Sequence, residues 1–120
     1  MTMTRINPEY DGVELVIAIQ EELDRMDELT ETMREEGFAM DEAERVYRVE
    51  KRKRLLYEKS RGTAVGIIQD VVKGYEDIAA LKKASDDSEH AYWTTKQAIE
   101  NAQRRIDFMR DLMRYERRGE

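Results

Sequence analysis

The feature that most constrains this chain is an unbroken alternation of three- and four-residue spacings in its second half. The positions are Ile78, Leu81, Ser85, Ser88, Tyr92, Thr95, Ile99, Ala102, Ile106, Met109 and Met113. An α-helix completes a turn in about 3.6 residues, so these positions form one stripe, the a/d seam of a coiled coil. The pattern predicts a long helix over about 75–116, with small polar residues in the middle of its seam.

The first half of the chain carries a second seam that is less regular. Its positions are Val16, Ile19, Leu23, Met26, Thr30 and Met33, resuming in a shifted phase at Met40, Ala43, Val46, Val49 and Leu56. A helix over about 13–61 follows, with two alternatives near Gly37. One is a continuous or kinked helix with a phase slip, which we favour because an internal glycine costs only about 1 kcal/mol. The other is a break, with a second helix from Asp41, whose spacing to Glu44 fits a capping box.

The segment between the two seams reads as a connector. Gly62 is a good helix stop, and Thr63 is expected to cap a short helix over about 64–73, which Gly74 closes. The apolar residues of this helix are Ile67, Ile68, Val71 and Val72, and we expect them to pack against the end of the hairpin. Residues 1–11 are expected to form a flexible arm whose Asp11 caps the first helix, and residues 12–118 a single domain.

Charge is arranged in blocks that select the direction of the two helices. Residues 9–42 hold thirteen acidic residues against two arginines, whereas residues 45–61 hold eight basic residues. Residues 76–89 are mainly acidic and residues 104–118 mainly basic. Folding back at the connector sets each acidic block beside a basic one. Each exposed pair is worth only ~0–1 kcal/mol, but the arrangement avoids repulsion. The predicted fold is therefore all-α, a long antiparallel, coiled-coil-like helical hairpin with a short connector helix.

A lone two-helix hairpin buries little apolar surface, and this chain has apolar side chains to spare. They are Leu15, Ile17, Phe38, Leu55, Trp93 and Leu112. Dimerisation into a four-helix arrangement is the simplest way to bury them, so we expect a homo-oligomer.

Several classes of function are disfavoured by composition. The chain has no cysteine, which excludes disulfides and thiolate metal sites and fits a reducing compartment. The longest strictly apolar run, residues 15–19, is too short to cross a bilayer, and no secretory signal is recognisable. One histidine, His90, makes a poor transition-metal site. We therefore expect a cytoplasmic protein that is not an enzyme, has no cofactor or metal, and does not associate with membranes.

Candidate partner-binding residues are of two kinds. Lys51, Arg52, Lys53 and Arg54 form the densest run of positive charge, although a full helical turn cannot face one partner. The run is either a solvated surface balanced by residues 76–89, which we favour, or a contact for phosphates or an acidic protein; Arg104 and Arg105 extend the basic set. Trp93 lies one position off the seam and is either buried in the protein's own assembly, which we favour, or a hot-spot anchor for a partner.

From Tyr47 onward the chain resembles a group of small helical proteins of tailed phages of Gram-positive bacteria, often encoded near recombination and replication genes. The resembling residues are Tyr47-Arg48, Lys51, Lys53, Gly62, Val65, Ile68, Asp70, Lys73-Gly74, Ile78 to Leu81, Asp86 to Tyr92, Lys96, Ala98-Ile99 and Glu116-Arg117. The resemblance covers the carboxy-terminal two thirds of the chain. It implies a phage or prophage context and assigns no mechanism.

Three functions compete at this point. The first is a protein–protein interaction, as an inhibitor of host DNA-handling or defence machinery, because acidic helices can occupy grooves that normally hold nucleic acid. The second is a nucleic-acid-binding accessory of recombination or replication that uses the run at 51–54 and the carboxy-terminal arginines; the net charge of −6 argues mildly against it. The third is a structural coiled-coil scaffold.

Overall fold

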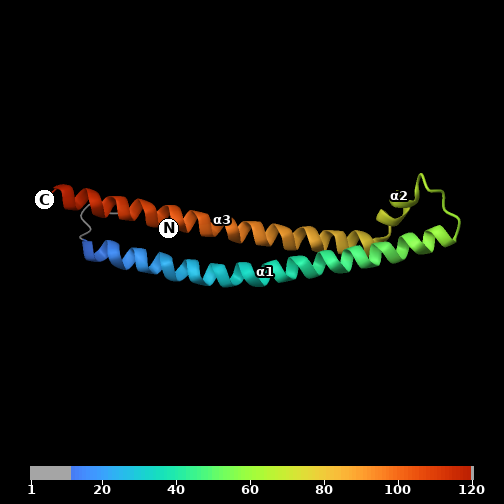
Figure 1. Cartoon of the computed structure of the whole chain (residues 1–120), viewed down its shortest axis with the longest axis horizontal. Coiled ribbons are helices and arrows are strands. Elements are labelled where there is room, and N and C mark those ends of the chain that lie inside the picture. Colours follow the sequence, from blue (N-terminus) through green and yellow to red (C-terminus); the bar gives the residue numbers. More distant parts are fainter. Residues whose placement is uncertain (1–11, 120) are drawn as a thin grey trace. The chain divides into compact units, whose positions relative to one another are not determined.

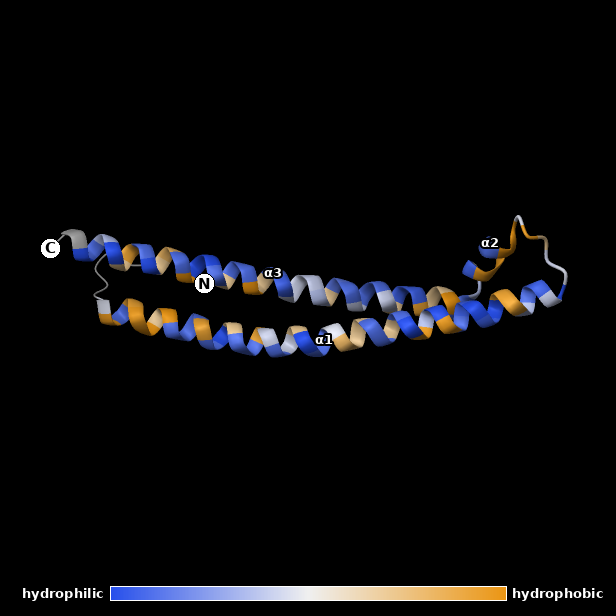
Figure 2. Ribbon diagram, viewed as in Figure 1, coloured by the Kyte–Doolittle hydropathy of each residue, from blue (hydrophilic) through white to orange (hydrophobic). Residues whose placement is uncertain are grey.

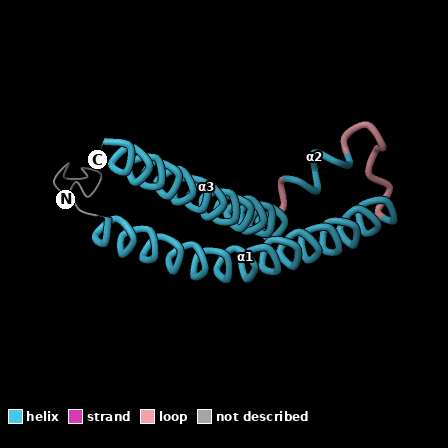
Figure 3. Tube along the Cα trace, turned by 60° about the vertical axis from the view of Figure 1, so that its left-hand side comes forward, coloured by secondary structure: helices cyan, strands magenta, loops and turns pink. Residues whose placement is uncertain are grey.

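The computed structural model describes residues 12–119, and every regular element within that range is an α-helix. The elements are α1 (Gly12–Ser60), α2 (Ile68–Lys73) and α3 (Glu76–Gly119). A connector of turns and irregular chain joins α1 to α2 (Figures 1 and 3). The prediction of an all-α helical hairpin with a short connector helix is confirmed, and the long helices are each a few residues from their predicted bounds.

The chain divides into two compact units, each containing a stretch of α1 and a stretch of α3. The terminal unit consists of residues 12–32 and 95–119, and the connector unit of residues 33–94. In the terminal unit α1 packs on α3 through a buried cluster that includes Leu15 and Ile106. In the connector unit, Gly37 approaches Tyr92 while Arg54 reaches Asp77, so rising numbers on α1 meet falling numbers on α3. The helices are therefore antiparallel, as the charge blocks predicted.

The terminal unit has an apolar core. Leu15, Ile106 and Met109 are buried and packed together, and Ala102 is also buried. Half-buried apolar residues surround this cluster: Ala18, Ile19, Leu23, Met26, Leu112 and Met113. Complete burial of a side chain such as Leu15 or Ile106 contributes about 1.5–3 kcal/mol, so these few residues hold the two helices of this unit together.

The connector unit has a smaller apolar core with polar members. Val72 and Ile78 are fully buried, and Glu58 and Ser85 are buried with them. Val72 anchors α2, which confirms in part that the connector packs on the hairpin. Val65 and Ile67, by contrast, are exposed, so these two apolar side chains of the connector are not part of the core.

The seam predicted on α3 is confirmed. Ile78, Ser85, Ala102, Ile106 and Met109 are buried. The remaining positions, Leu81, Ser88, Tyr92, Thr95, Ile99 and Met113, are half-buried, and none is exposed. The heptad pattern therefore identified the inward side of this helix, including its polar middle.

The seam predicted on α1 is partly wrong. Val16, Thr30, Val49 and Leu56 are exposed. The predicted positions Ile19, Leu23, Met26, Met33, Met40, Ala43 and Val46 are half-buried. One row of protected positions keeps a single phase through Gly37: Leu15, Ile19, Glu22, Met26, Leu29, Met33, Glu36, Met40, Ala43, Tyr47, Glu50 and Arg54. The predicted phase slip is absent because charged residues occupy seam positions. Two of these charged side chains are held by α3, Glu22 by Arg105 and Arg54 by Asp77.

Two glycines have the roles that the helices require. α1 is continuous at Gly37, so the alternative with a second helix from Asp41 is wrong. A Cβ on Gly37 would lie 3.4 Å from Cε1 of Tyr92, which shows how closely the ring approaches the α1 backbone. Gly62 has a φ of 87°, a left-handed conformation suited to glycine, and it lies just after the end of α1 as predicted.

The connector differs from its prediction in one detail. α2 begins at Ile68 rather than near residue 64, and its N-cap residue, Ile67, makes no side-chain capping hydrogen bond. Thr63 is not the cap, because its hydroxyl donates to the Glu58 carboxylate at 2.7 Å. The flexible arm over residues 1–11 and the cap by Asp11 lie outside the described residues.

Candidate interaction surface

The outward side of α1 in the terminal unit is strongly acidic. Six exposed residues form what we call the acidic face: Glu14, Glu21, Asp24, Asp27, Glu28 and Glu31. Glu14, Glu21 and Glu28 recur every seven residues, so they share one line along the helix. The basic residue of α1 in this unit is Arg25, which leaves the face with a large negative charge.

Three residues of the acidic face are not neutralised by α3. Among the described residues, Glu21, Asp27 and Glu28 form no ion pair. Arg105 pairs with Glu22, a seam residue outside the face, with Nε of Arg105 2.5 Å from Oε1 of Glu22. This pair is a contact of the kind predicted between the basic end of the chain and the acidic first helix.

A groove lies between α1 and α3 in the same unit. Two hollows share Val16, Met113 and Arg117, and together they form a groove whose apolar part also includes Val13, Ile17 and Ile19. Three arginines, Arg110, Arg114 and Arg117, line the α3 side together with one acidic residue, Glu116. We call this the terminal groove. Sequence reasoning missed it, although the apolar residues off the α1 seam, which colour the start of the helix orange in Figure 2, were the available signal.

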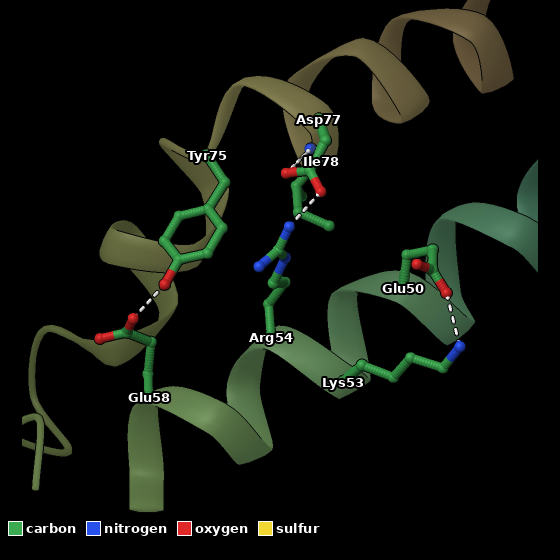
Figure 4. Close-up of polar contacts among 7 residues, drawn as sticks. All are labelled: Glu50, Lys53, Arg54, Glu58, Tyr75, Asp77 and Ile78. Carbon is green, nitrogen blue, oxygen red and sulfur yellow. Dashed lines mark hydrogen bonds and ion pairs between the residues drawn. The ribbon is translucent and has the colours of Figure 1, made fainter. Parts of the chain in front are cut away.

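The basic run at 51–54 is dispersed around α1. Lys53 pairs with Glu50 of its own helix at 2.9 Å, and Arg54 pairs with Asp77 of α3 at 2.6 Å (Figure 4). Lys51 lies over the Tyr47 ring at 5.6 Å, and Arg52 is exposed. The run therefore forms no single basic surface, and two of its members are engaged within the hairpin.

The other predicted partner residues lie apart from this run. Arg104 is exposed and donates to the side chain of Asn101 at 3.0 Å, whereas Arg105 is occupied by Glu22. Trp93 is 51% exposed and meets Tyr92 edge to face, with ring centroids 5.3 Å apart. Burial of Trp93 within the chain does not occur; its burial between copies stays a prediction.

A buried carboxylate closes the connector unit. Glu58 is only 3% exposed, and its carboxylate accepts a hydrogen bond from the Tyr75 hydroxyl (Figure 4). It also accepts a hydrogen bond from the Thr63 hydroxyl. Arg61 adds a contact at 3.6 Å. The hydrogen bonds from Tyr75 and then Thr63 hold the pKa of Glu58 below its usual value. The hydrogen bond to Glu58, followed by burial, raises the pKa of the Tyr75 hydroxyl. This cluster ties the end of α1 to the start of α3, which is a structural role.

The second polar tie in this unit is the pair between Arg54 and Asp77. The hydrogen bond from Arg54 lowers the pKa of Asp77. The guanidinium also lies over the Tyr75 ring, 4.9 Å from its centroid. Arg54, a member of the predicted basic run, therefore links α1 to the start of α3.

The described residues, 12–119, contain neither a cluster that could bind a metal ion nor a helix that could span a membrane. No group of three or more metal-ligating side chains is close enough there to hold an ion. No helix in that range is long and apolar enough to span a membrane.

Comparison with known proteins adds no relative. No protein-family model, curated protein or solved structure matches the chain. The resemblance to phage proteins therefore stays a prediction, and the function has to be argued from the surface alone.

Proposed function

We propose that the chain is a non-enzymatic, cytoplasmic phage or prophage accessory protein that acts by protein–protein interaction. Its acidic face occupies a basic, nucleic-acid-binding groove on a host DNA-handling or defence protein and so inhibits that protein. The observation that supports this most is the lack of neutralisation, since Glu21, Asp27 and Glu28 have no ion pair among the described residues.

The spacing of charge supports the same partner. The six residues of the acidic face lie between Glu14 and Glu31, roughly 26 Å of helix at about 1.5 Å per residue. The mean separation is therefore roughly 5 Å, somewhat wider than the ~3.4 Å between phosphates along one DNA strand. A helix that carries these carboxylates offers a basic groove a negatively charged rod, and complementary fields favour fast association.

A nucleic-acid-binding role receives less support from the contacts. Three basic residues of the candidate set form ion pairs within the chain: Lys53 with Glu50, Arg54 with Asp77, and Arg105 with Glu22. Binding along a phosphate backbone requires cations that can exchange small counterions for phosphates. We therefore keep this role as the outcome that would replace the proposal.

A competition experiment tests the acidic face. Host DNA-binding proteins are loaded from a Gram-positive lysate onto immobilised duplex DNA at low salt, and the chain is then applied at constant salt. We expect the chain to elute a subset of these proteins, because carboxylates on α1 replace phosphates in their grooves. The effect should fade as salt rises.

Matched variants make the result specific. Glu21→Gln with Glu28→Gln removes two charges from the acidic face, whereas Glu89→Gln with Glu100→Gln removes two exposed charges from α3. We expect the first variant to elute at least about tenfold less protein and the second to behave as the native chain. Equal loss in both variants, or retention of the chain itself on the DNA, would contradict the proposal.

A further inference from the structure

The terminal groove exposes apolar side chains and arginines that the other described residues, 12–119, leave largely uncovered. Val13, Val16 and Ile17 are 66%, 52% and 53% exposed. Arg110 and Arg117 form no ion pair with another described residue, and Arg114 pairs with its neighbour Asp111 at the surface. An occupant must therefore supply an apolar ridge flanked by carboxylates.

We propose that the occupant is a second copy of this chain, with α1 of each copy lying along α3 of the other. Val13, Val16 and Ile17, which line the groove, are exposed on the same helix as the acidic face. The apolar side chains and the carboxylates that an occupant needs are therefore on the same unit as the groove. A two-fold interface needs a surface that is complementary to itself, because the same residues of both copies make the contact.

Charge distinguishes the two ways in which two copies of the terminal unit could pack against each other. If α1 met α1 of the partner, two acidic helices would face each other. If α1 meets α3 of the partner, the acidic helix faces the side lined by Arg110, Arg114 and Arg117. Like charges in register are costly and opposite charges favourable, so the second arrangement is selected. Each α1 then lies between two α3 helices, as in a four-helix bundle.

The helix periodicity identifies the carboxylates that take part. At about 100° per residue, Asp27 lies within roughly 20° of Val16 around α1, and Asp24 within roughly 80°. Glu21 lies roughly 140° away, so a copy docked at Val16 leaves it in solvent. Glu14, Glu21 and Glu28 of the acidic face can therefore contact a foreign partner while Asp24 and Asp27 face a second copy, and self-association does not rest on the proposed inhibitor function.

The association state of the full chain tests the proposal. By sedimentation velocity over a range of concentrations, we expect the native chain to be a dimer. Val16→Asp, which places a carboxylate in the apolar floor of the groove, should raise the dimer dissociation constant at least about tenfold. Val65→Asp is the matched control, because Val65 is 85% exposed in the connector unit, and it should leave the dimer intact.

A second pair of variants guards against misfolding as the cause. Arg110→Glu with Arg114→Glu changes only exposed side chains and should also dissociate the dimer, with the far-ultraviolet circular dichroism unchanged. A native chain that stays monomeric, or charge-reversed and Val16→Asp chains that dimerise as well as the native one, would overturn the proposal.

Cross-linking distinguishes the arrangement, since the chain has no native cysteine. A tagged Ile17→Cys chain and an untagged Arg114→Cys chain are mixed and treated with a short bis-maleimide. We expect the mixed 17–114 product to exceed the 17–17 product at least about fivefold, because complementary charge brings α1 to α3 of the partner. A dominant 17–17 product would mean that α1 meets α1, and would contradict the arrangement. If the DNA competition fails but the mixed 17–114 product dominates, only the proposed inhibitor function is contradicted.

Discussion

The terminal unit and the connector unit share one heptad pattern, but the contact between α1 and α3 inside each unit is stabilised in a different way. In the terminal unit the seam is filled by large apolar side chains, and Leu15, Ile106 and Met109 form a buried cluster. In the connector unit the buried residues include Ser85 and Glu58 as well as Val72 and Ile78, and Glu58 is held by hydrogen bonds from Tyr75 and Thr63. Heptad spacing therefore sets which side of a helix faces inward, whereas the residues on that side decide what stabilises the contact.

The largest expected effect is in the apolar unit. Ile106→Ala should lower the free energy of unfolding by about 2–5 kcal/mol, because it deletes a fully buried side chain and leaves a cavity. Urea denaturation followed by circular dichroism measures the change. Phe108→Ala is the control, two residues away and 54% exposed, and it should cost no more than about 0.5 kcal/mol. Similar losses in both variants would mean that this core does not hold the unit.

The polar unit should respond to acid through Glu58. Because the folded state lowers the pKa of this carboxyl, its ionised form stabilises the protein above the unfolded pKa of about 4.5. That contribution is lost as the pH falls through the lower, folded value. The free energy of unfolding of the native chain should thus fall steeply below about pH 4.5.

The matched variant for the acid experiment is Glu58→Gln, which keeps the shape of the side chain and cannot ionise. It should be less stable than the native chain at pH 7 and less sensitive to acid, so that the two curves converge at low pH. Asp77, whose pKa is also lowered, contributes acid sensitivity to both proteins equally. Parallel curves would show that Glu58 is not ionised and bonded as described.

A smaller effect is expected where the Tyr75 hydroxyl meets Glu58. Tyr75→Phe removes this donor while the ring and the Thr63 donor remain. The loss of one hydrogen bond should lower Tm by about 5 °C at neutral pH. Tyr115→Phe is the control, because Tyr115 is 76% exposed, and differential scanning calorimetry should find its Tm unchanged.

The smallest expected effect is at Gly37 in the connector unit. Gly37→Ala should stabilise α1 by about 0.5–1 kcal/mol, because alanine is the better helix former. The new Cβ would lie 3.4 Å from the Tyr92 ring, so a small shift of the ring accommodates it. Ala39→Gly is the converse change at an exposed site of the same helix and should destabilise by a similar amount. A destabilised Gly37→Ala protein would mean that the ring cannot move.

Most of the fold could be predicted from the sequence, because helix periodicity and charge blocks are local signals. The α3 seam, the helix stop at Gly62 and the antiparallel direction are all confirmed. The phase of α1 could not be derived from apolar residues alone, since Glu22, Glu36 and Glu50 occupy inward positions every fourteen residues. Val16 was assigned to the seam because its apolar character is the same whether it faces a helix or a groove.

The candidate site was less predictable, because it depends on which charges find partners in space. The sequence identified the run of Lys51 to Arg54, but it could not show that Arg54 would be bound by Asp77. Arg105 was likewise a candidate until Glu22 was found beside it. Glu58 was missed as a buried carboxylate, although an acidic residue within a basic block was a signal of a local partner.

Native-state hydrogen exchange of the full chain is the most direct test of the contrast between the two units. We expect the highest opening free energies for amides at 15–29 and 99–113, where the apolar side chains are packed. Lower values are expected at 50–60 and 68–85. Addition of urea should lower protection in the second group first. Equal opening free energies in the two groups, or the reverse order, would contradict the claim that apolar burial holds one unit and polar contacts the other.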